Sequence, residues 1–256
     1  MKSLLAFTKK EITSQLRSVR LIILGILFVL LGAMNTAIAK LTPLLLDAVS
    51  DTISQSGISI TPVTVSALDS WMQFFKNIPL GLIVFILLES DIFTREYRSG
   101  TLIPPLTKGL ARHNVVISKA VVLTTLWTLC YWLCFVITYC CNAYFWDNSV
   151  AQNLMFSVVC WWLFGLWVTV SAVFFSTVAK SNIIVLAGVG CSILALYLLS
   201  FIPELKAYLP IMLTDGNSLI SGIEKAKTYN SAIIITGVLT IAYLAVSFPV
   251  FNKRNL

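Results

Sequence analysis

The feature that most constrains this chain is a set of long runs without a charged residue. Five runs of 19 to 32 residues contain no Asp, Glu, Lys, Arg or His, and they cover 21–39, 120–146, 148–179, 181–203 and 228–252. A helix needs about 20 apolar residues to cross the hydrocarbon core of a membrane. Each run is therefore long enough to span a bilayer. The runs are continuous and do not alternate as the strands of a membrane barrel would.

A sixth span is predicted where the charge-free run is shorter. Residues 77–88 reach span length if the helix begins near Trp71 and includes Lys76, Glu89 and Asp91 near its ends. Composition agrees, because 58% of the residues are hydrophobic and 11% are charged, against about 45–50% and about 25% in soluble domains. These values exclude a soluble enzyme, a disordered chain and a disulfide scaffold. We expect an all-α integral membrane protein, a single domain over 1–256 with spans at 21–39, 71–93, 117–146, 150–179, 182–202 and 230–251.

The basic residues predict which side of the membrane each end faces. With the N-terminus in the cytoplasm, six spans return the C-terminus there, and 13 of the 18 Lys and Arg residues lie on the cytoplasmic side. The opposite orientation reverses this ratio, and cytoplasmic loops carry an excess of Lys and Arg. The sequence therefore predicts an N-in/C-in protein. The net charge of +7 reflects this bias; membrane lipids with anionic head groups are its natural counterpart, and no nucleic acid is required.

Residues 1–20 are predicted to form an amphipathic helix on the inner membrane surface. Four apolar residues fall on one helical face: Leu5, Ile12, Leu16 and Val19. The basic residues Lys2, Lys9 and Lys10 lie elsewhere around the helix.

The connections between spans carry most of the remaining information. On the outer side, 44–53 is predicted to form a short amphipathic helix, and within the outer loop 203–229 two prolines, Pro203 and Pro210, bracket a helical or re-entrant piece. On the inner side, the loop 94–116 is basic and is predicted to hold a short helix over 95–102. Pro104-Pro105 is expected to end that helix, since proline interrupts helical hydrogen bonding.

The order of these features resembles a permease subunit of the ATP-binding cassette type-2 exporter family. Such proteins begin with an interfacial helix, here MKSLLAFTKKEITSQLRS, and their second span runs into a cytoplasmic stretch with a glutamate, a Gly-Thr-Leu step, an arginine and then a lysine that opens the third span. The matching residues here are Glu96, Gly100-Thr101-Leu102, Arg112 and Lys119. The sequence departs from the family at Pro104-Pro105, where helix-compatible leucines are expected.

The resemblance implies partners and a division of labour. A type-2 permease pairs with a second permease, either a copy of itself or a homologue, and with two cytosolic ATPase subunits that hold ATP and Mg. The sequence contains no G-x-x-x-x-G-K-[ST] phosphate loop, so we expect no nucleotide cofactor on this chain. The residues expected to form the ATPase-coupling segment are Arg95, Glu96, Arg98, Ser99, Gly100, Thr101 and Leu102.

Small residues in two spans have two interpretations. Gly25 and Gly32 share one face of the first span, and Gly188 and Ser192 form a small-xxx-small pair in the fifth. Such residues let helix backbones approach closely, either within one chain or at an interface between two permeases. The resemblance, which implies the first and fifth spans at that interface, favours the second interpretation.

Two acids at the inner end of the second span also have two interpretations. Glu89 and Asp91 could serve in gating, because ionisable residues at membrane depth are costly and often functional. Alternatively, Asp91 pairs with Arg95 four residues later and both acids lie among the head groups.

The leading hypothesis is a non-catalytic permease, in the plasma membrane of a bacterium, that exports an amphipathic or hydrophobic substrate such as an antimicrobial peptide, a drug or a lipid-linked compound. Uncharged spans rich in tryptophan support it: Trp127, Trp132, Trp161, Trp162 and Trp167. The alternative is an ion-coupled secondary transporter, which typically has charged residues near the middle of the membrane and an internal sequence repeat. An intramembrane enzyme or metal site is disfavoured, because no span contains a histidine and the six cysteines are interpreted as packing residues.

Overall fold

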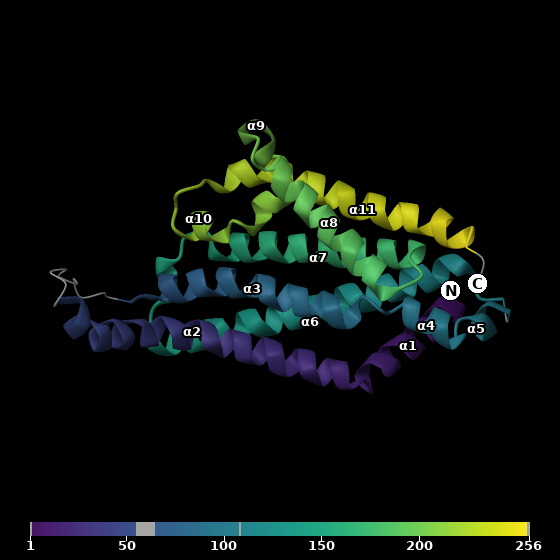
Figure 1. Cartoon of the computed structure of the whole chain (residues 1–256), viewed down its shortest axis with the longest axis horizontal. Coiled ribbons are helices and arrows are strands. Elements are labelled where there is room, and N and C mark those ends of the chain that lie inside the picture. The colour runs from purple at the N-terminus through teal and green to yellow at the C-terminus, as the bar shows by residue number, and fades with distance from the viewer. Residues whose placement is uncertain (1, 55–64, 108, 255–256) are drawn as a thin grey trace.

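The computed structural model describes residues 2–54, 65–107 and 109–254, and this part of the chain is built from helices and their connections (Figure 1). Six segments in it are long and apolar enough to cross a membrane, which confirms the predicted all-α membrane fold. They are Val19–Leu44, Ala67–Tyr97, Arg112–Phe145, Leu154–Val178, Asn182–Leu199 and Ala226–Asn252.

The helices follow one another as a bundle of long spans joined by short elements. The α-helices are α1 (Lys2–Leu16), α2 (Val19–Ser54), α3 (Ala67–Glu89), α4 (Thr94–Ser99), α5 (Ile103–Thr107), α6 (Arg112–Phe145), α7 (Leu154–Val178), α8 (Asn182–Leu199), α9 (Pro203–Lys206), α10 (Gly216–Ile220) and α11 (Asn230–Asn252). Three short 3-10 helices complete the list: η1 (Asn148–Val150), η2 (Pro210–Thr214) and η3 (Ala226–Tyr229).

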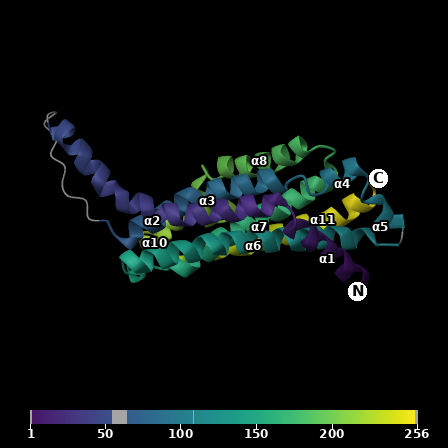
Figure 2. The same ribbon diagram turned by 90° about the horizontal axis from the view of Figure 1, so that it is seen from below.

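The first span is longer than its charge-free run. The run 21–39 predicts one span and 44–53 a separate short helix, whereas α2 is a single helix from Val19 to Ser54 that contains Pro43. At its other end an elbow at residues 17–18 separates α2 from α1, so α1 leaves the bundle at an angle (Figure 2). Both described chain ends, with α4 and α5, lie at this same end of the molecule (Figure 1), which we call the basic end.

The end of the short helix in loop 94–116 differs from the sequence prediction. Gly100, not Pro104-Pro105, terminates α4, because Gly100 adopts the left-handed conformation with φ of 66° that glycine takes without steric cost. The two prolines lie instead in the first turn of α5. Amide groups of a first turn have no intrahelical acceptor, so proline is tolerated there.

The core of the bundle is aromatic. Trp71, Phe74, Phe85, Trp127 and Tyr131 of α3 and α6 are all fully buried and stack mostly edge to face with ring centroids 5.4 to 5.9 Å apart. Such pairs contribute roughly 0.5–1.5 kcal/mol each beyond the area that they bury. Trp161 and Trp167 of α7 are buried as well, so three of the five tryptophans that supported the export hypothesis pack inside the chain.

Buried and half-buried polar side chains join α2, α3 and α6 within the spans. Asn77 donates to Asn35 at 2.8 Å, Asn35 donates to Thr138 at 3.0 Å, and Thr36 donates to Asn142 at 2.9 Å. Interhelical hydrogen bonds in membranes stabilise packing by roughly 0.6 kcal/mol each on average. These bonds fix the rotation of the three helices about one another.

The predicted outer loop, 203–229, folds back onto the bundle. Its η2 packs on α7, α8 and α11, and its α10 packs on α3 and α7. Trp161 donates its indole N–H to the carbonyl of Thr214 at 2.9 Å, and Tyr229 donates its hydroxyl to the carbonyl of Asp215 at 3.0 Å. The segment therefore closes the end of the bundle opposite to the basic end.

Candidate functional site

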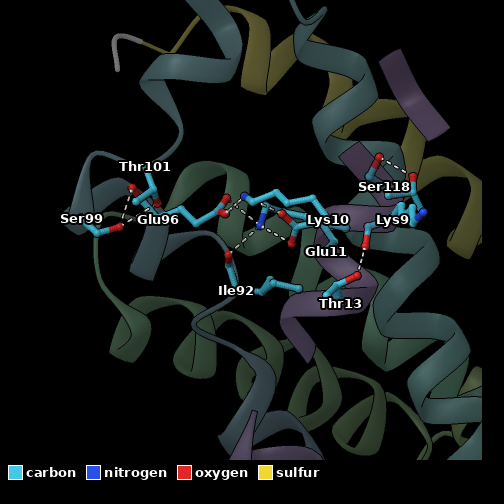
Figure 3. A network of polar contacts seen from close by, with 11 residues as sticks. Lys9, Lys10, Glu11, Thr13, Ile92, Glu96, Ser99, Thr101 and Ser118 are labelled. Carbon is cyan, nitrogen blue, oxygen red and sulfur yellow. Dashed lines mark hydrogen bonds and ion pairs between the residues drawn. The ribbon is translucent and has the colours of Figure 1, made fainter. Parts of the chain in front are cut away.

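Three segments far apart in the sequence meet at the basic end of the bundle (Figure 3). They are α1, the turn from α3 into α4, and the first turns of α6. The α1 helix packs along α6, where the hydroxyls of Thr8 and Ser118 lie 2.8 Å apart. Two charged side chains are buried between these segments: Glu11 is 5% exposed and Lys119 is 1% exposed. Burying a charge is costly unless it is paired and hydrogen-bonded, so this site must be built from complementary charges.

Four residues form a closed ring of alternating charge, which we call the charge ring: Lys10, Glu11, Lys119 and Glu96. Figure 3 labels Lys10, Glu11 and Glu96 of this ring. Lys119 Nζ lies 3.1 Å from Glu11 Oε2 and 2.8 Å from Glu96 Oε2. Lys10 Nζ lies 2.9 Å from Glu96 Oε1 and 3.2 Å from Glu11 Oε1. Each carboxylate thus contacts both ammonium groups, and the ring has no net charge.

The ammonium group of Lys119 has a complete set of partners. It pairs with the two carboxylates, and it donates a hydrogen bond to the carbonyl of Ile92 at 3.0 Å. The ring of Phe93 lies 5.2 Å from the same nitrogen. Removing one partner from such a buried network costs roughly 3–5 kcal/mol. The charge ring therefore holds α4 to both α1 and α6.

Lys10 closes the ring at its solvent side. Partial burial lowers the pKa of Lys10, but the hydrogen bond and the negative charge of Glu96, together with Glu11, outweigh burial and raise its pKa above the ordinary value. The ammonium group therefore stays charged throughout the physiological pH range.

A second set of contacts fastens the start of α2 to the end of α3. The guanidinium of Arg20 makes a two-pronged ion pair with Asp91 and also donates to the carbonyl of Leu88 at 2.8 Å. This pairing replaces the predicted contact between Asp91 and Arg95, whose side chain is exposed. Tertiary packing brings Arg20 to the carboxylate, and its fork of donors suits bidentate pairing.

Glu89 is the most buried acid of the chain part that the structure describes, at 2% exposure. Gln15 of α1 donates to its Oε2 at 2.7 Å, while Oε1 has no hydrogen-bond partner. Glu89 and Asp91 are the two acids for which gating was considered. Glu89 is held by α1, and Asp91 is held by the start of α2.

The predicted coupling residues divide into buried and exposed groups. Glu96 faces the charge ring, with its side chain 15% exposed, and Leu102 is buried at 2%. Ser99 and Thr101 are exposed, and their hydroxyls lie 2.9 Å apart across Gly100. The side chain of Arg98 lies outside the described residues. Of the predicted coupling residues, Arg95, Ser99 and Thr101 are therefore exposed and open to another protein, whereas Glu96 pairs with Lys10 and Lys119 in the charge ring.

The partners of Glu96 were not predicted from the sequence. Lys119 was noted only as part of a family pattern, Lys10 only as a basic residue of the predicted amphipathic helix, and Glu11 was given no role. One signal was present: Glu11 is the single acidic residue among the first 20, which otherwise carry only basic charges.

The C-terminal tail contributes a further set of contacts with α4. Arg254 donates to the carbonyls of Thr177 at 2.7 Å and Ala179 at 2.8 Å, and its guanidinium lies 3.9 Å from the ring centre of Tyr97. Arg112 at the start of α6 donates to the carbonyl of Arg254 at 2.7 Å. Arg254 thus satisfies carbonyls at the end of α7, where a cation is also favoured by the helix dipole, and joins that end to α4.

The glycines proposed for an interface between permeases differ in their surroundings. A Cβ on Gly32 would lie 2.9 Å from the carbonyl oxygen of Cys134, and a Cβ on Gly188 would lie 2.4 Å from the ring of Phe175. Both glycines therefore serve close packing inside this chain. The hydroxyl of Ser192 donates to the carbonyl of Gly188 at 2.9 Å. Gly25 has no atom near the corresponding position, so it remains available for contact with another molecule.

One groove opens within the spans, between α6, α7 and α11. It has a volume of about 390 Å³, and its walls combine threonine hydroxyls with apolar side chains: Thr124, Thr125, Thr128, Leu129, Trp162, Leu166, Val170 and Thr240. Trp162 donates its indole N–H to Thr128 at 3.1 Å. Within the described chain, no group of three His, Cys, Asp or Glu side chains could hold a metal ion.

A family model described as an ABC-2 family transporter protein matches residues 5–228. The chain belongs to the ABC-2 transporter family. The matched region extends from α1 to η3 and includes every member of the charge ring. No curated protein matches the chain as a relative. Membership of the ABC-2 family, together with six apolar helices, makes this a multi-pass membrane protein of transporter type, and ABC-2 permeases associate in general with an ABC ATPase.

Proposed function

We propose that the chain is the permease subunit of an ABC exporter, and that a separate cytosolic ATPase drives it through α4. The observation that carries the proposal is the charge ring, in which the Glu96 carboxylate of α4 contacts both Lys10 of α1 and Lys119 of α6. Because these ion pairs join α4 to α1 and α6, a displacement of α4 moves α1 and α6 as well. ATP and Mg bind on the partner.

The proposed coupling acts through rigid contacts. Closure of two ATPase subunits displaces α4, and the charge ring carries that displacement into α1 and the first turns of α6. Arg254 carries it to the end of α7, because its guanidinium bridges Tyr97 and the carbonyls of Thr177 and Ala179. The spans then rock between inward-open and outward-open states. A second permease, a copy or a homologue, completes the path.

The proposed cargo is amphipathic or hydrophobic. The groove between α6, α7 and α11 offers apolar walls with a few hydroxyl groups, which suits a ligand that is mainly apolar and carries few hydrogen-bonding groups. No charged residue lines it. An antimicrobial peptide, a drug or a lipid-linked compound in a bacterial plasma membrane has this character.

One experiment tests the proposal directly. The tagged chain is purified from its native membrane in mild detergent, and the preparation is assayed for ATP hydrolysis and for a bound protein with a phosphate-binding loop. We expect both, and we expect the activity to disappear when the lysine of that loop is replaced. A preparation that carries no ATPase, yet moves cargo in vesicles without ATP, would contradict the proposal.

Glu89 gives one observation in favour of an ion-coupled secondary transporter. Its buried Oε1 atom lacks a partner, which is the kind of group that could take up a proton during transport. Transport that follows an imposed proton gradient in vesicles without ATPase, and that is lost in Glu89→Gln, would establish this alternative.

A further inference from the structure

The α1 helix has three distinct faces, and only one of them packs on the bundle. Phe7 and Glu11, 6% and 5% exposed, lie on the packed face. The second face is an apolar strip of Leu5, Ile12 and Leu16, which are 66%, 45% and 65% exposed. Exposed leucine and isoleucine on a helix at the end of a membrane bundle belong in the hydrocarbon boundary of the bilayer. The strip therefore places α1 at the level of the lipid head groups.

The third face is a cationic groove. It has a volume of about 590 Å³ and is lined by Ala6, Lys9, Lys10, Thr13, Ser14 and Arg17, with no carboxylate among them. Lys10 shares its charge with two carboxylates of the charge ring. Lys9 and Arg17 are exposed and form no ion pair with any residue that the structure describes. The groove thus has an uncompensated positive charge.

We propose that this groove binds the head group of an anionic phospholipid of the inner leaflet. Lys9 follows Leu5 by four residues and precedes Ile12 by three, so it borders the apolar strip, while Arg17 lies two turns further along on the groove side. A lipid whose acyl chain lies along Leu5, Ile12 and Leu16 places its phosphate beside Lys9 and Arg17. A lipid satisfies both faces at once, because its acyl chain meets the apolar strip while its phosphate meets the cations of the groove.

The site is connected to α4 through Lys10. This residue lines the groove and also belongs to the charge ring, where its ammonium contacts Glu96. A phosphate in the groove therefore lies next to a group that holds α4 in place. The binding site itself depends neither on the cargo nor on the proposed ATPase.

Lipid retention by the purified full-length chain tests the proposal. The delipidated protein in detergent is titrated with phosphatidylglycerol or with phosphatidylcholine of identical chains, and bound lipid is counted by native mass spectrometry. We expect selective retention of phosphatidylglycerol that weakens with added KCl. We expect affinity to fall about fivefold for Lys9→Gln and about thirtyfold for Lys9→Gln with Arg17→Gln, from the attraction of each cation to an anionic surface.

The matched control removes two exposed cations elsewhere at the basic end, Lys180→Gln with Lys253→Gln, and should leave the affinity unchanged. Unaltered melting temperatures of the ligand-free variants show that folding is intact. Equal retention of both lipids, or equal loss in the control, would overturn the proposal. Full competition by inorganic phosphate would show a site for free anions, and tight binding of an acidic peptide with no lipid preference would show a protein-docking face; either result would also overturn it.

Discussion

At the scale of single residues, the ion pairs of the charge ring hold α1, α4 and α6 together at the basic end. Lys119 is 1% exposed and has two carboxylates and one carbonyl as partners. Loss of one partner destabilises such a buried cation, since its charge is then only partly compensated and cannot be solvated by water. Gly100 at the end of α4 is specialised in a different way, because its φ of 66° is open to glycine and strained for most other residues.

Replacing Lys119 should destabilise the chain strongly. Lys119→Met leaves Glu11 and Glu96 facing each other with only Lys10, and we expect a loss of about 3–5 kcal/mol in the free energy of unfolding. The melting temperature of the detergent-solubilised protein measures this loss. Lys119→Met combined with Glu11→Met should recover most of it, because Lys10 still neutralises Glu96. The exposed Lys180→Met is the control, expected within about 0.5 kcal/mol of the original chain. Equal behaviour of Lys119→Met and this control would show that the ring is not structural.

Changes in α4 should separate ATP hydrolysis from transport in the proposed complex. Glu96→Ala releases α4 from both lysines, and Gly100→Pro removes the left-handed end of α4, since proline holds φ near about −65°. We expect both variants to insert into the membrane normally and to hydrolyse ATP without moving cargo. Gly100→Asn is the matched control, because asparagine tolerates the left-handed region. Full transport by both variants would remove α4 from the coupling path.

At the scale of elements, close helix packing depends on where each small residue lies. In α2, Gly32 faces α6 with no space for a methyl group, whereas Gly25 has nothing within 4 Å of its missing Cβ. Of these two glycines in one helix, Gly32 serves packing within the chain, and Gly25 is free for contact with a second molecule.

These two glycines allow a matched substitution. Gly32→Ala should push α2 away from the backbone of Cys134 and lower stability by about 1–3 kcal/mol. Gly25→Ala should leave the isolated chain unchanged or slightly more stable, because alanine favours helix by about 0.5–1 kcal/mol over glycine. Melting temperature measures the first effect. Loss of dimer on size exclusion in Gly25→Leu alone would place Gly25 at an interface between permeases, and an unchanged dimer would exclude it.

At the scale of the whole molecule, the fold gathers α1, α4 and both described chain ends at one end of the bundle (Figure 1). The opposite end is closed by η2 and α10, which pack on the spans. Coupling and cargo release would therefore act at opposite ends. The proposal requires that the basic end face the cytoplasm.

Cysteine labelling in intact cells tests this orientation. On a background in which the six native cysteines are replaced by alanine, Glu204→Cys in the predicted outer loop should react with a membrane-impermeant maleimide, and Ser99→Cys at the end of α4 should react only once the membrane is opened. Both positions are exposed, so the difference reports the membrane side alone. Labelling of Ser99→Cys in intact cells would reverse the orientation and exclude contact between α4 and a cytosolic ATPase.

Much of the fold could be predicted because membrane insertion is governed by composition along the chain. A charge-free run such as 148–179 has no alternative to a buried or lipid-facing helix, and α7 forms within it. Helix ends were predicted less well, because they depend on local backbone geometry. Gly100 ends α4 before the prolines are reached, and α2 continues through Pro43 past the end of the apolar run.

The candidate site could be predicted only in part. Glu96 and Lys119 were both noted, but their pairing depends on the packing of α1 along α6, which no local pattern specifies. The same is true of Asp91, which pairs with Arg20 across 71 residues instead of with Arg95 on its own helix turn.

By itself, the sequence determined that this chain is a bundle of membrane helices, because the hydrocarbon core excludes charged residues and leaves the helix as the way to satisfy the backbone. Only the tertiary structure decided which charges meet, since an ion pair needs two groups within a few ångströms and that distance is set by packing between helices. The charge ring, the bond between Arg20 and Asp91 and the bridge made by Arg254 all belong to this second kind.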